Sequence, residues 1–297
     1  MEQNNKKISV GVVLAIIFAS LVGLGLIGGL IYMFMPSGGS VGRSGSSSSS
    51  NNNGFDIFNS SDDNNSREGN PSKPVSKQMP LDQFMEIDVN VESMTVIIKP
   101  GDKYEVDYQT VEGLEPRISQ NGKGLSIIQQ GSIRNPGQDY MSELYIMVPQ
   151  GAQLATARIK CGGAHIHMRD VTVYTTDLYT TAGDIVVANV NSQATNATTD
   201  AGEIVMESVD MGQSQLSTNA GDITIRASRF GDISSSTNAG NIHIEGMMED
   251  LSKYNMNLNT QKGKITVQSQ DQGNTYSTTG GVFAMDLTTD AGDISIQ

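Results

Sequence analysis

An eight-residue motif recurs at a fixed interval of 19 residues through the C-terminal half of the chain. A period of this length is typical of solenoids, in which each repeat buries its apolar face only against its neighbours. The motif reads T-T-A-G-D-I-V-V at 180–187, T-D-A-G-E-I-V-M at 199–206, T-N-A-G-D-I-T-I at 218–225 and T-N-A-G-N-I-H-I at 237–244. Looser copies follow at 260–267 and 289–296, after intervals of 23 and 29 residues. Projection backward from the first copy reaches Ala164, so regular repeats are predicted over 155–297.

Equivalent positions of the repeats share their chemical character. The residue two after the glycine is always Ile, and the residue four after it is Val, Met or Ile. Five before the glycine stand Leu178, Ala197, Leu216, Ser235, Leu258 and Leu287. Such alternation is typical of strands with one buried face, so one coil of about 19 residues holds at least two short strands. The predicted fold is all-β, a single-stranded β-helix or β-solenoid. We expect the glycine at a turn that needs positive φ, closed by the Asp or Asn side chain beside it.

Five further apolar or alternating stretches precede the regular repeats, with turn signals between them. They cover 84–91, 95–99, 104–108, 125–129 and 144–148. Two interpretations stay open for this region. The strands either begin or cap the solenoid, or they form a small separate sandwich.

Residues 8–35 form a stretch without a charged side chain, preceded by Lys6 and Lys7. As a helix it would be about 42 Å long, which exceeds the hydrocarbon thickness of about 30 Å. We predict a transmembrane signal anchor over 8–35. The paired lysines favour a cytoplasmic tail over 1–7 and place the rest of a single-pass protein outside the cytoplasm. A cleaved signal peptide is the alternative, although its apolar core is usually shorter.

Residues 36–79 are rich in Ser, Gly and Asn and contain few apolar side chains. Burial there cannot offset the entropy of ordering, so a disordered linker is predicted. The folded ectodomain is then expected over 80–297. Gly25 and Gly29 form a G-x-x-x-G pattern in the anchor, which is typical of helices that pair within membranes. Self-association through these glycines is therefore an expectation.

Charge and cysteine content exclude several classes of function. The net charge is −13, which argues against binding to nucleic acid through bulk charge. Cys161 is the only cysteine, so neither an intrachain disulfide nor a zinc site built from several thiols is possible. Cys161 falls in the same column as Thr180 and Thr199, which indicates a structural thiol rather than a nucleophile.

Several motifs together resemble the bacterial putative-adhesin family of β-strand-repeat proteins. They are F-x-x-I-D-V at 84–89, V-I-I-K-P-G-D at 96–102, G-K-G-L-S-I at 122–127, L-Y-I-M-V-P-Q-G-A at 144–152 and the repeated T-x-A-G-D-I-x-I. The resemblance covers about 80–297. It implies a single-stranded β-helix, often behind a membrane anchor, with roles in adhesion or envelope stress and without established catalytic residues. Lys262 and Lys264 depart from the pattern, so the fifth coil is expected to be irregular.

Acidic side chains at the corner of successive coils are the principal candidates for chemistry. Asp184, Glu203 and Asp222 would lie about 5 Å apart, a spacing compatible with a glycosidase pair or a weak Ca²⁺ site. They are more simply explained as solvated corner residues that help to close a turn, and catalysis would also need a partly dry pocket. No catalytic residue and no cofactor is therefore predicted, with Ca²⁺ on these three carboxylates kept as the metal candidate. His165 and His167 are expected on the surface, too far from His243 to share a metal.

Departures from the 19-residue period locate two insertions, at 246–256 and 268–285. Insertions in solenoids form loops on one face, often the binding face. Apolar and aromatic anchors of such a face would be Met247, Met248, Tyr254, Tyr276 and Phe283. The same segments could instead cap the C-terminal coil, whose edge is otherwise open.

The leading hypothesis is a non-catalytic, adhesin-like surface protein in the cell membrane that displays a β-solenoid to a partner. That partner would be an envelope polymer, another surface protein or a neighbouring membrane protein. An accessory of a cell-envelope stress-sensing complex is the alternative. An envelope carbohydrate-active enzyme is a third hypothesis.

Overall fold

The computed structural model describes residues 73–132 and 142–297. Within that part, the only helix is the short 3₁₀ helix η1 (Leu251–Lys253), and no helix there is long and apolar enough to cross a membrane. The predicted tail, anchor and Gly25–Gly29 pattern lie outside the described residues. So does the predicted linker up to residue 72.

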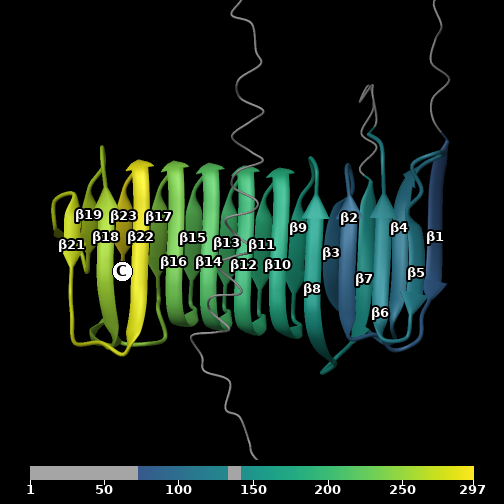
Figure 1. Cartoon of the computed structure of the whole chain (residues 1–297), viewed down its shortest axis with the longest axis horizontal. Helices are drawn as coiled ribbons and strands as arrows, with labels where there is room; N and C mark the ends of the chain where they lie inside the picture. Colours follow the sequence, from purple (N-terminus) through teal and green to yellow (C-terminus); the bar gives the residue numbers. More distant parts are fainter. Residues whose placement is uncertain (1–72, 133–141) are drawn as a thin grey trace, which may run out of the picture. The chain divides into compact units, whose positions relative to one another are not determined.

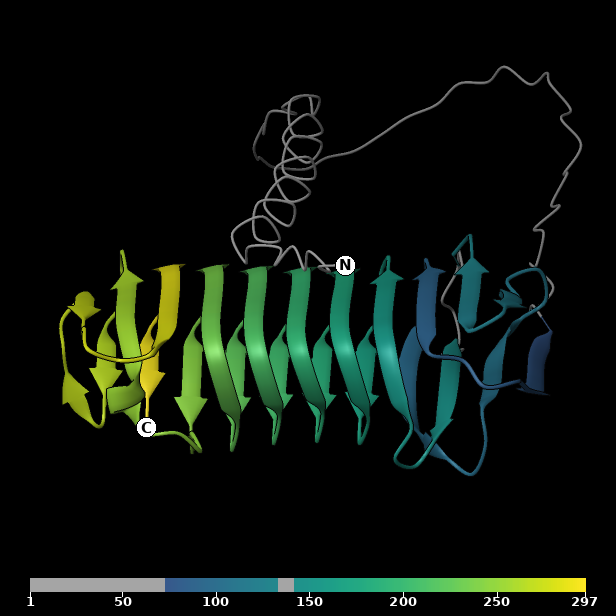
Figure 2. The same cartoon turned by 60° about the horizontal axis from the view of Figure 1, so that its bottom comes forward.

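The described strands form two sheets, which Figures 1 and 2 show facing each other. The twelve-stranded sheet has the spatial order β1 (Pro74–Pro80), β4 (Glu105–Val111), β7 (Glu143–Pro149), β3 (Thr95–Gly101), β9 (Ile166–Arg169), β11 (Ile185–Ala188), β13 (Ile204–Glu207), β15 (Ile223–Arg226), β17 (Ile242–Glu245), β23 (Ile294–Ile296), β19 (Ile265–Val267) and β20 (Gln270–Asp271). The eleven-stranded sheet has the order β21 (Thr275–Ser277), β18 (Tyr254–Thr260), β22 (Phe283–Ala291), β16 (Arg229–Ala239), β14 (Asp210–Ala220), β12 (Asn191–Ala201), β10 (Thr172–Ala182), β8 (Gln153–Cys161), β2 (Glu86–Val91), β6 (Gly124–Gln129) and β5 (Arg117–Asn121).

Each coil contributes one strand to each sheet, and neighbouring coils pair in parallel. Leu178 pairs with Ala197 in one sheet, and Ile185 pairs with Ile204 in the other. Both pairs are 19 residues apart, so the predicted period equals one turn of the chain. The array begins with β8 and β9, which pair with β10 and β11.

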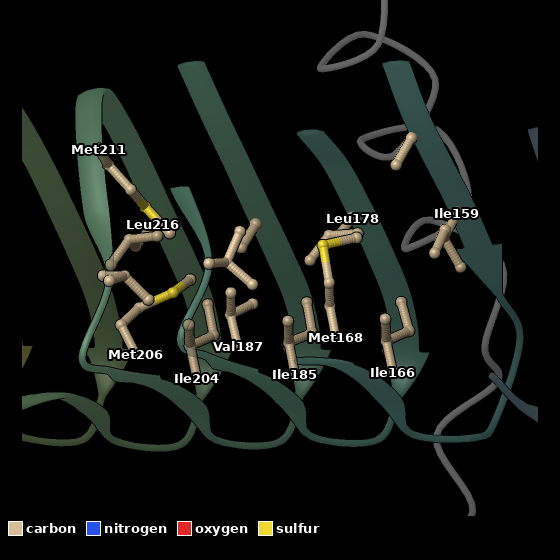
Figure 3. Packing of buried hydrophobic residues seen from close by; sticks show 14 of the residues in the cluster. Ile159, Ile166, Met168, Leu178, Ile185, Val187, Ile204, Met206, Met211 and Leu216 are labelled. Atoms are coloured by element: carbon tan, nitrogen blue, oxygen red, sulfur yellow. The ribbon is translucent and has the colours of Figure 1, made fainter. Parts of the chain in front are cut away.

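The core lies between the sheets and is built from stacked copies of the same side chains. Ile166, Ile185 and Ile204 follow one another in register, and all are completely buried. Figure 3 shows this row, with Leu178 and Leu216 approaching it from the opposite sheet. A single coil is too small to cover its own apolar side chains, so each coil depends on its neighbours to bury them.

The N-terminal strands continue the same stack. β2 pairs in parallel with β8, and β3 pairs with β9. β6 and β7 then add the next coil outward. The separate-sandwich alternative is wrong, because one hydrophobic cluster runs from Phe84 to Ile296.

Antiparallel strands close the N-terminal end of this stack. β5 covers the edge of β6, β4 covers the edge of β7, and β1 covers β4. The predicted linker over 36–79 is wrong for its last six residues, because 74–79 belong to β1. The larger apolar side chains of β1 are Val75 and Met79, both half-buried, and it becomes a strand because the edge of β4 offers unpaired backbone groups.

The C-terminal end contains an element that the sequence order does not predict. The last coil, β22 and β23, lies between β16/β17 and β18/β19, so it separates two coils that precede it in the chain. Figure 1 shows β22 (yellow) between β16 and β18. The fifth coil, which carries Lys262 and Lys264, keeps its register, with Ile265 opposite Ile294. The expected local irregularity is therefore not found in the pairing of this coil. Its position along the stack is what differs from the sequence order.

The corner glycines are required by close contact between coils. A Cβ added to Gly202 would lie 2.1 Å from the carbonyl oxygen of Gly183, and one added to Gly240 would lie 1.9 Å from that of Gly221. Only Gly221 among these corner glycines has a positive φ, at 157°, close to extended backbone. The expectation of a left-handed turn at this corner is therefore wrong. Glycine is needed because any side chain would collide with the preceding coil.

Threonine and aspartate side chains tie the same corner together. Oγ1 of the buried Thr199 donates to the carbonyl oxygen of Gly183 (2.9 Å), and Thr218 repeats this bond to Gly202 (3.0 Å). Outside the core, Oδ1 of Asp184 accepts a hydrogen bond from the N–H of Glu203 (2.9 Å). The acidic side chain thus bonds to the next coil rather than closing its own turn. The T-x-A-G-D motif is a connector between coils.

The left-handed residues lie at a different corner. Asp170, Asn189, Ser208 and Ala227 have φ between 47° and 56°, again at intervals of 19 residues. Glycine, Asn and Asp tolerate this region best, and Gly246 occupies the next equivalent position at 64°. The repeats share no residue type at this corner.

Replacement of Gly202 by Ala tests the contact at the glycine corner. We expect a loss of about 1–3 kcal/mol in the free energy of unfolding, as for overpacked cores. Gly163→Ala is the matched control, because its Cβ would meet nothing within 4 Å and the effect should stay within about 1 kcal/mol. Urea unfolding of both variants measures the difference. Equal stabilities would contradict the close-contact explanation.

Removal of residues 283–297 tests the inserted coil. We expect the shortened chain to lose thermal stability, since β16/β17 and β18/β19 would each have an unpaired edge. A synthetic peptide of residues 283–297 should bind and restore the melting temperature. A peptide carrying Ile294→Asp and Ile296→Asp serves as control. Unchanged melting after removal, or no effect of the native peptide, would show that the two edges close on each other.

Candidate functional site

The three corner carboxylates proposed for calcium occupy successive coils. Asp184 accepts a backbone hydrogen bond from Glu203, and Oδ1 of Asp222 accepts one from the N–H of Asn241 (2.6 Å). Two of the three thus use one oxygen to join coils. Within the described residues, no group of three or more His, Cys, Asp or Glu side chains is placed to hold a metal ion. A calcium site here stays a prediction.

His165 and His167 lie on the outer surface on either side of the buried Ile166, as the alternation predicts. Their ring centroids are 6.1 Å apart. Nδ1 of His165 accepts a hydrogen bond from the N–H of Asp184 (3.0 Å), which assigns the ring proton to Nε2 when His165 is neutral. Burial and the neighbouring His165 lower the pKa of His167.

A polar cluster on the twelve-stranded sheet brings together residues that are distant in sequence. Ser295 Oγ lies 2.5 Å from Nδ1 of His243, and Nε2 of His243 lies 3.1 Å from Oε2 of Glu245. Hydrogen bonds from His243 and from Nε of Arg226 (2.8 Å) lower the pKa of Glu245. Ser295 arrives from the inserted last coil, so its position beside His243 could not be read from the repeat order.

This cluster has the residue types of a nucleophile and its base but not their usual surroundings. Acyl transfer needs hydrogen-bond donors aimed at the developing oxyanion. Ser295 stands on β23, whose two edges are paired with β17 and β19. Glu245 is about two-fifths exposed, and His243 is less so. The arrangement stabilises neighbouring coils at the surface and encloses no substrate.

Cys161 occupies the threonine column, as predicted. Its Sγ lies 3.8 Å from the carbonyl oxygen of Met94 and donates to it, in the role that Thr180 performs toward Ala164. Burial raises the pKa of the Cys161 thiol to about 12. A buried thiol with this pKa is unreactive near neutral pH.

The second insertion, at 268–285, supplies the strands of the C-terminal cap. β20 pairs with the edge of β19, and β21 pairs with the edge of β18. Tyr254 is a wrong candidate for a surface anchor: it is 1% exposed, and its hydroxyl donates to the carbonyl oxygen of Phe230 (2.7 Å). The edges of β18 and β19 would otherwise be open at this end of the stack, and β20 and β21 cover them.

The other insertion candidates differ in exposure. Met247, Tyr276 and Phe283 are partly buried against the core, and the ring of Phe283 lies 5.7 Å from that of Tyr254. Met248 is the exposed member, at 56%. Four of the five candidates thus contribute to the cap or its packing.

A surface absent from the sequence expectations is the outer face of the eleven-stranded sheet, which we call the polar face. We define it by the outward residues of β12, β14 and β16, the strands that lie side by side in Figure 1. Strand register places these residues in rows across the coils. The rows include Asn196, Gln215 and Ser234, then Thr198, Ser217 and Ser236, then Asp200, Asn219 and Asn238. All are half-buried or exposed.

Hydrogen bonds between coils order the polar face. Nδ2 of Asn219 donates to Oδ1 of Asp200 (3.3 Å), and Nδ2 of Asn238 donates to Oδ1 of Asn219 (3.2 Å). Ser236 donates to Oγ of Ser217 (3.2 Å). These groups repeat at the strand spacing of about 4.8 Å. Neutral polar residues at equivalent outward positions of the repeats were the signal that could have located this face.

A hollow lies at the N-terminal end of the same sheet. It is lined by outward side chains of β2, β8 and neighbouring strands, among them Glu86, Asp88, Thr156 and Arg158. Opposite charges are therefore present together there. The surface of the hollow is polar. A glycosidase needs two carboxyl groups, and here they would have to be Glu86 and Asp88, which are exposed to solvent.

Comparison with known proteins finds one matching family and several similar solved structures. The sequence profile of the Toastrack DUF4097 family matches residues 84–297. No curated protein matches the chain. Similar solved structures include a putative adhesin from Bacteroides fragilis (14% identity, 76% of this chain and 97% of that chain, TM-score 0.48) and a putative adhesin from Parabacteroides merdae (11%, 76% and 97%, 0.43). A putative lipid binding protein from Parabacteroides distasonis is also similar (11%, 77% and 98%, 0.40).

The thiol of Cys161 should report unfolding. With its pKa near 12 instead of 9.0, the thiolate fraction at pH 8 falls by about two to three orders of magnitude. We expect a disulfide reagent to leave the native chain unlabelled and to label it rapidly in denaturant. A chain carrying Cys161→Thr and Ser236→Cys is the control, because residue 236 is exposed and should react when native. Rapid native labelling of Cys161 would contradict its structural role.

Proposed function

Since this chain belongs to the Toastrack DUF4097 family, we propose from its geometry that it is a non-catalytic binding protein of the cell envelope. The polar face on β12, β14 and β16 would be its binding surface. The polar face takes the place of the insertions as the proposed binding surface, because most of the apolar candidates in the insertions are buried or partly buried.

The ordered rows of the polar face carry the proposal. Binding normally costs entropy because surface side chains must be fixed in one rotamer. On this face, the chain from Asp200 through Asn219 to Asn238 is already hydrogen-bonded between coils. A ligand with repeated polar groups would therefore meet donors and acceptors that are fixed at a regular spacing. Several weak contacts along one ligand add up to useful affinity.

Catalysis is less well supported than binding. The cluster of Ser295, His243 and Glu245 lies on a sheet surface between paired strands. The corner carboxylates Asp184 and Asp222 accept backbone hydrogen bonds from neighbouring coils. Both sets of residues therefore have a structural use that explains their presence.

The placement in the cell is part of the same proposal and rests on the sequence. A single transmembrane anchor over 8–35 would hold the N-terminus in the cytoplasm and the solenoid outside. The partner would then be an envelope polymer, a surface protein or a neighbouring membrane protein. The alternative, an accessory role in an envelope stress-sensing complex, would act through the anchor and its Gly25–Gly29 pattern rather than through the polar face.

Binding of the full chain to cell-envelope fractions tests the proposal. We expect saturable binding that falls at least about tenfold when Asn196→Lys and Gln215→Lys place charges on the polar face. Thr224→Lys is the matched control, because Thr224 points outward from β15 on the other sheet. Thermal melting verifies that all variants are folded. Equal binding by both variants would reject the polar face and favour the accessory role.

A further inference from the structure

The polar face differs in charge from the rest of the chain. The chain has a net charge of −13, yet the outward positions of β12, β14 and β16 between the two ends of these strands are mostly Asn, Gln, Ser and Thr. Asp200 and Asp232 are the exceptions among them. The row of Asn196, Gln215 and Ser234 ends at Asp177 on β10 and Asp286 on β22. A polyanion would be repelled by the whole chain, and a polycation would find stronger sites elsewhere on it. The chemistry of this face therefore fits an uncharged ligand.

The spacing of the rows narrows the choice of polymer. Equivalent side chains on neighbouring coils lie about 4.8 Å apart along the axis of the stack. An extended polypeptide repeats about every 3.3 Å, and a nucleic acid strand about every 3.4 Å, so neither keeps step with the coils. One unit of an extended β-linked sugar chain is about as long as one strand spacing. Such a chain could set one sugar unit on every coil. Because successive β-1,4-linked units are turned over, the same groups would recur at every second coil.

The side chains also match the polar groups of sugars. Amides such as Asn196 and Gln215, and hydroxyls such as Ser234, each both donate and accept hydrogen bonds. Sugar hydroxyl groups do the same, so either partner can adjust its donor and acceptor roles. A run of carboxylates or lysines would accept only or donate only.

Two tyrosines lie on β10 beside these rows, where Tyr179 is in register with Thr198. Tyr174 on β10 is 66% exposed, and Tyr179 on the same strand is half-buried, with its hydroxyl donating to Oδ2 of Asp200 (3.1 Å). The C–H faces of pyranose rings pack against aromatic rings, which combine a flat apolar surface with a polar edge. An exposed tyrosine next to amide rows is thus a suitable place for a sugar ring.

We infer that the polar face binds an uncharged, extended, β-linked glycan laid along the axis of the stack, with one sugar unit for each coil. This inference rests on the proposed binding role and specifies its ligand. Six strands from β10 to β18 are available, which corresponds to about 24 Å. The glycan would cross the strands at right angles, between Tyr174 and the C-terminal cap.

Calorimetric titration of the full chain with β-1,4-linked N-acetylglucosamine oligomers tests the inference. We expect the hexasaccharide to bind at least about tenfold more tightly than the disaccharide, because it engages more coils. Added salt should change the affinity little, in contrast to the steep salt dependence of polyanion binding. The double variant Asn196→Ala and Gln215→Ala should lose at least about tenfold in affinity, since the amide donors and acceptors are removed. Tyr174→Ala should also weaken binding, independently of the amides.

Thr224→Ala, on the other sheet, serves as the matched control and should bind as the unaltered chain does. Absence of hexasaccharide binding, or equal affinity for disaccharide and hexasaccharide, would overturn the inference. Unchanged affinity in both the amide variant and Tyr174→Ala would overturn it as well. The proposed function would survive these results if envelope fractions still bound through the polar face, and would fail with the inference if they did not.

Discussion

Neighbouring coils of the regular repeats, which pair along both sheets, come into their shortest backbone contact at the glycine corner. The carbonyl oxygen of Gly183 lies where a Cβ on Gly202 would be, and it accepts the hydroxyl hydrogen of Thr199. Strand pairing in the two sheets sets the distance between coils, and glycine at this corner permits that distance. The buried threonine satisfies a carbonyl that would otherwise be costly to enclose. The rows of isoleucine and leucine can then pack without gaps.

The order of the coils follows from the need to close both ends. A stack of parallel strands leaves two open edges, each able to pair with another chain. At the N-terminal end β1, β4 and β5 pair antiparallel over the outer strands, and at the C-terminal end β20 and β21 do the same. The last coil is placed inside the stack, where β22 and β23 are paired on both sides. The strands of the C-terminal cap, β20 and β21, therefore precede the last coil in the sequence.

Stacking also generates the surface on which we base the function. A single Asn or Gln on a strand is unremarkable, but the register of β12, β14 and β16 turns separate residues into rows with a common spacing. The same geometry forms the cluster of Ser295, His243 and Glu245 on the other sheet. Its exposed, flat surroundings distinguish it from a catalytic centre, whose groups work in a site shielded from water. Regular spacing favours recognition of a regular ligand.

The sequence by itself determined the class of fold, the length of the coil, the buried columns and the structural role of Cys161, because each follows from periodicity within one or two repeats. It did not determine why glycine recurs, since Gly202 and Gly183 meet only after a full turn of the chain. It also left the place of β22 and β23 and the use of the insertions undecided. Those depend on which edges remain open once the other coils have paired. Only the tertiary structure decided them, because strand pairing is a contact between segments and the sequence pattern of each segment is compatible with more than one neighbour.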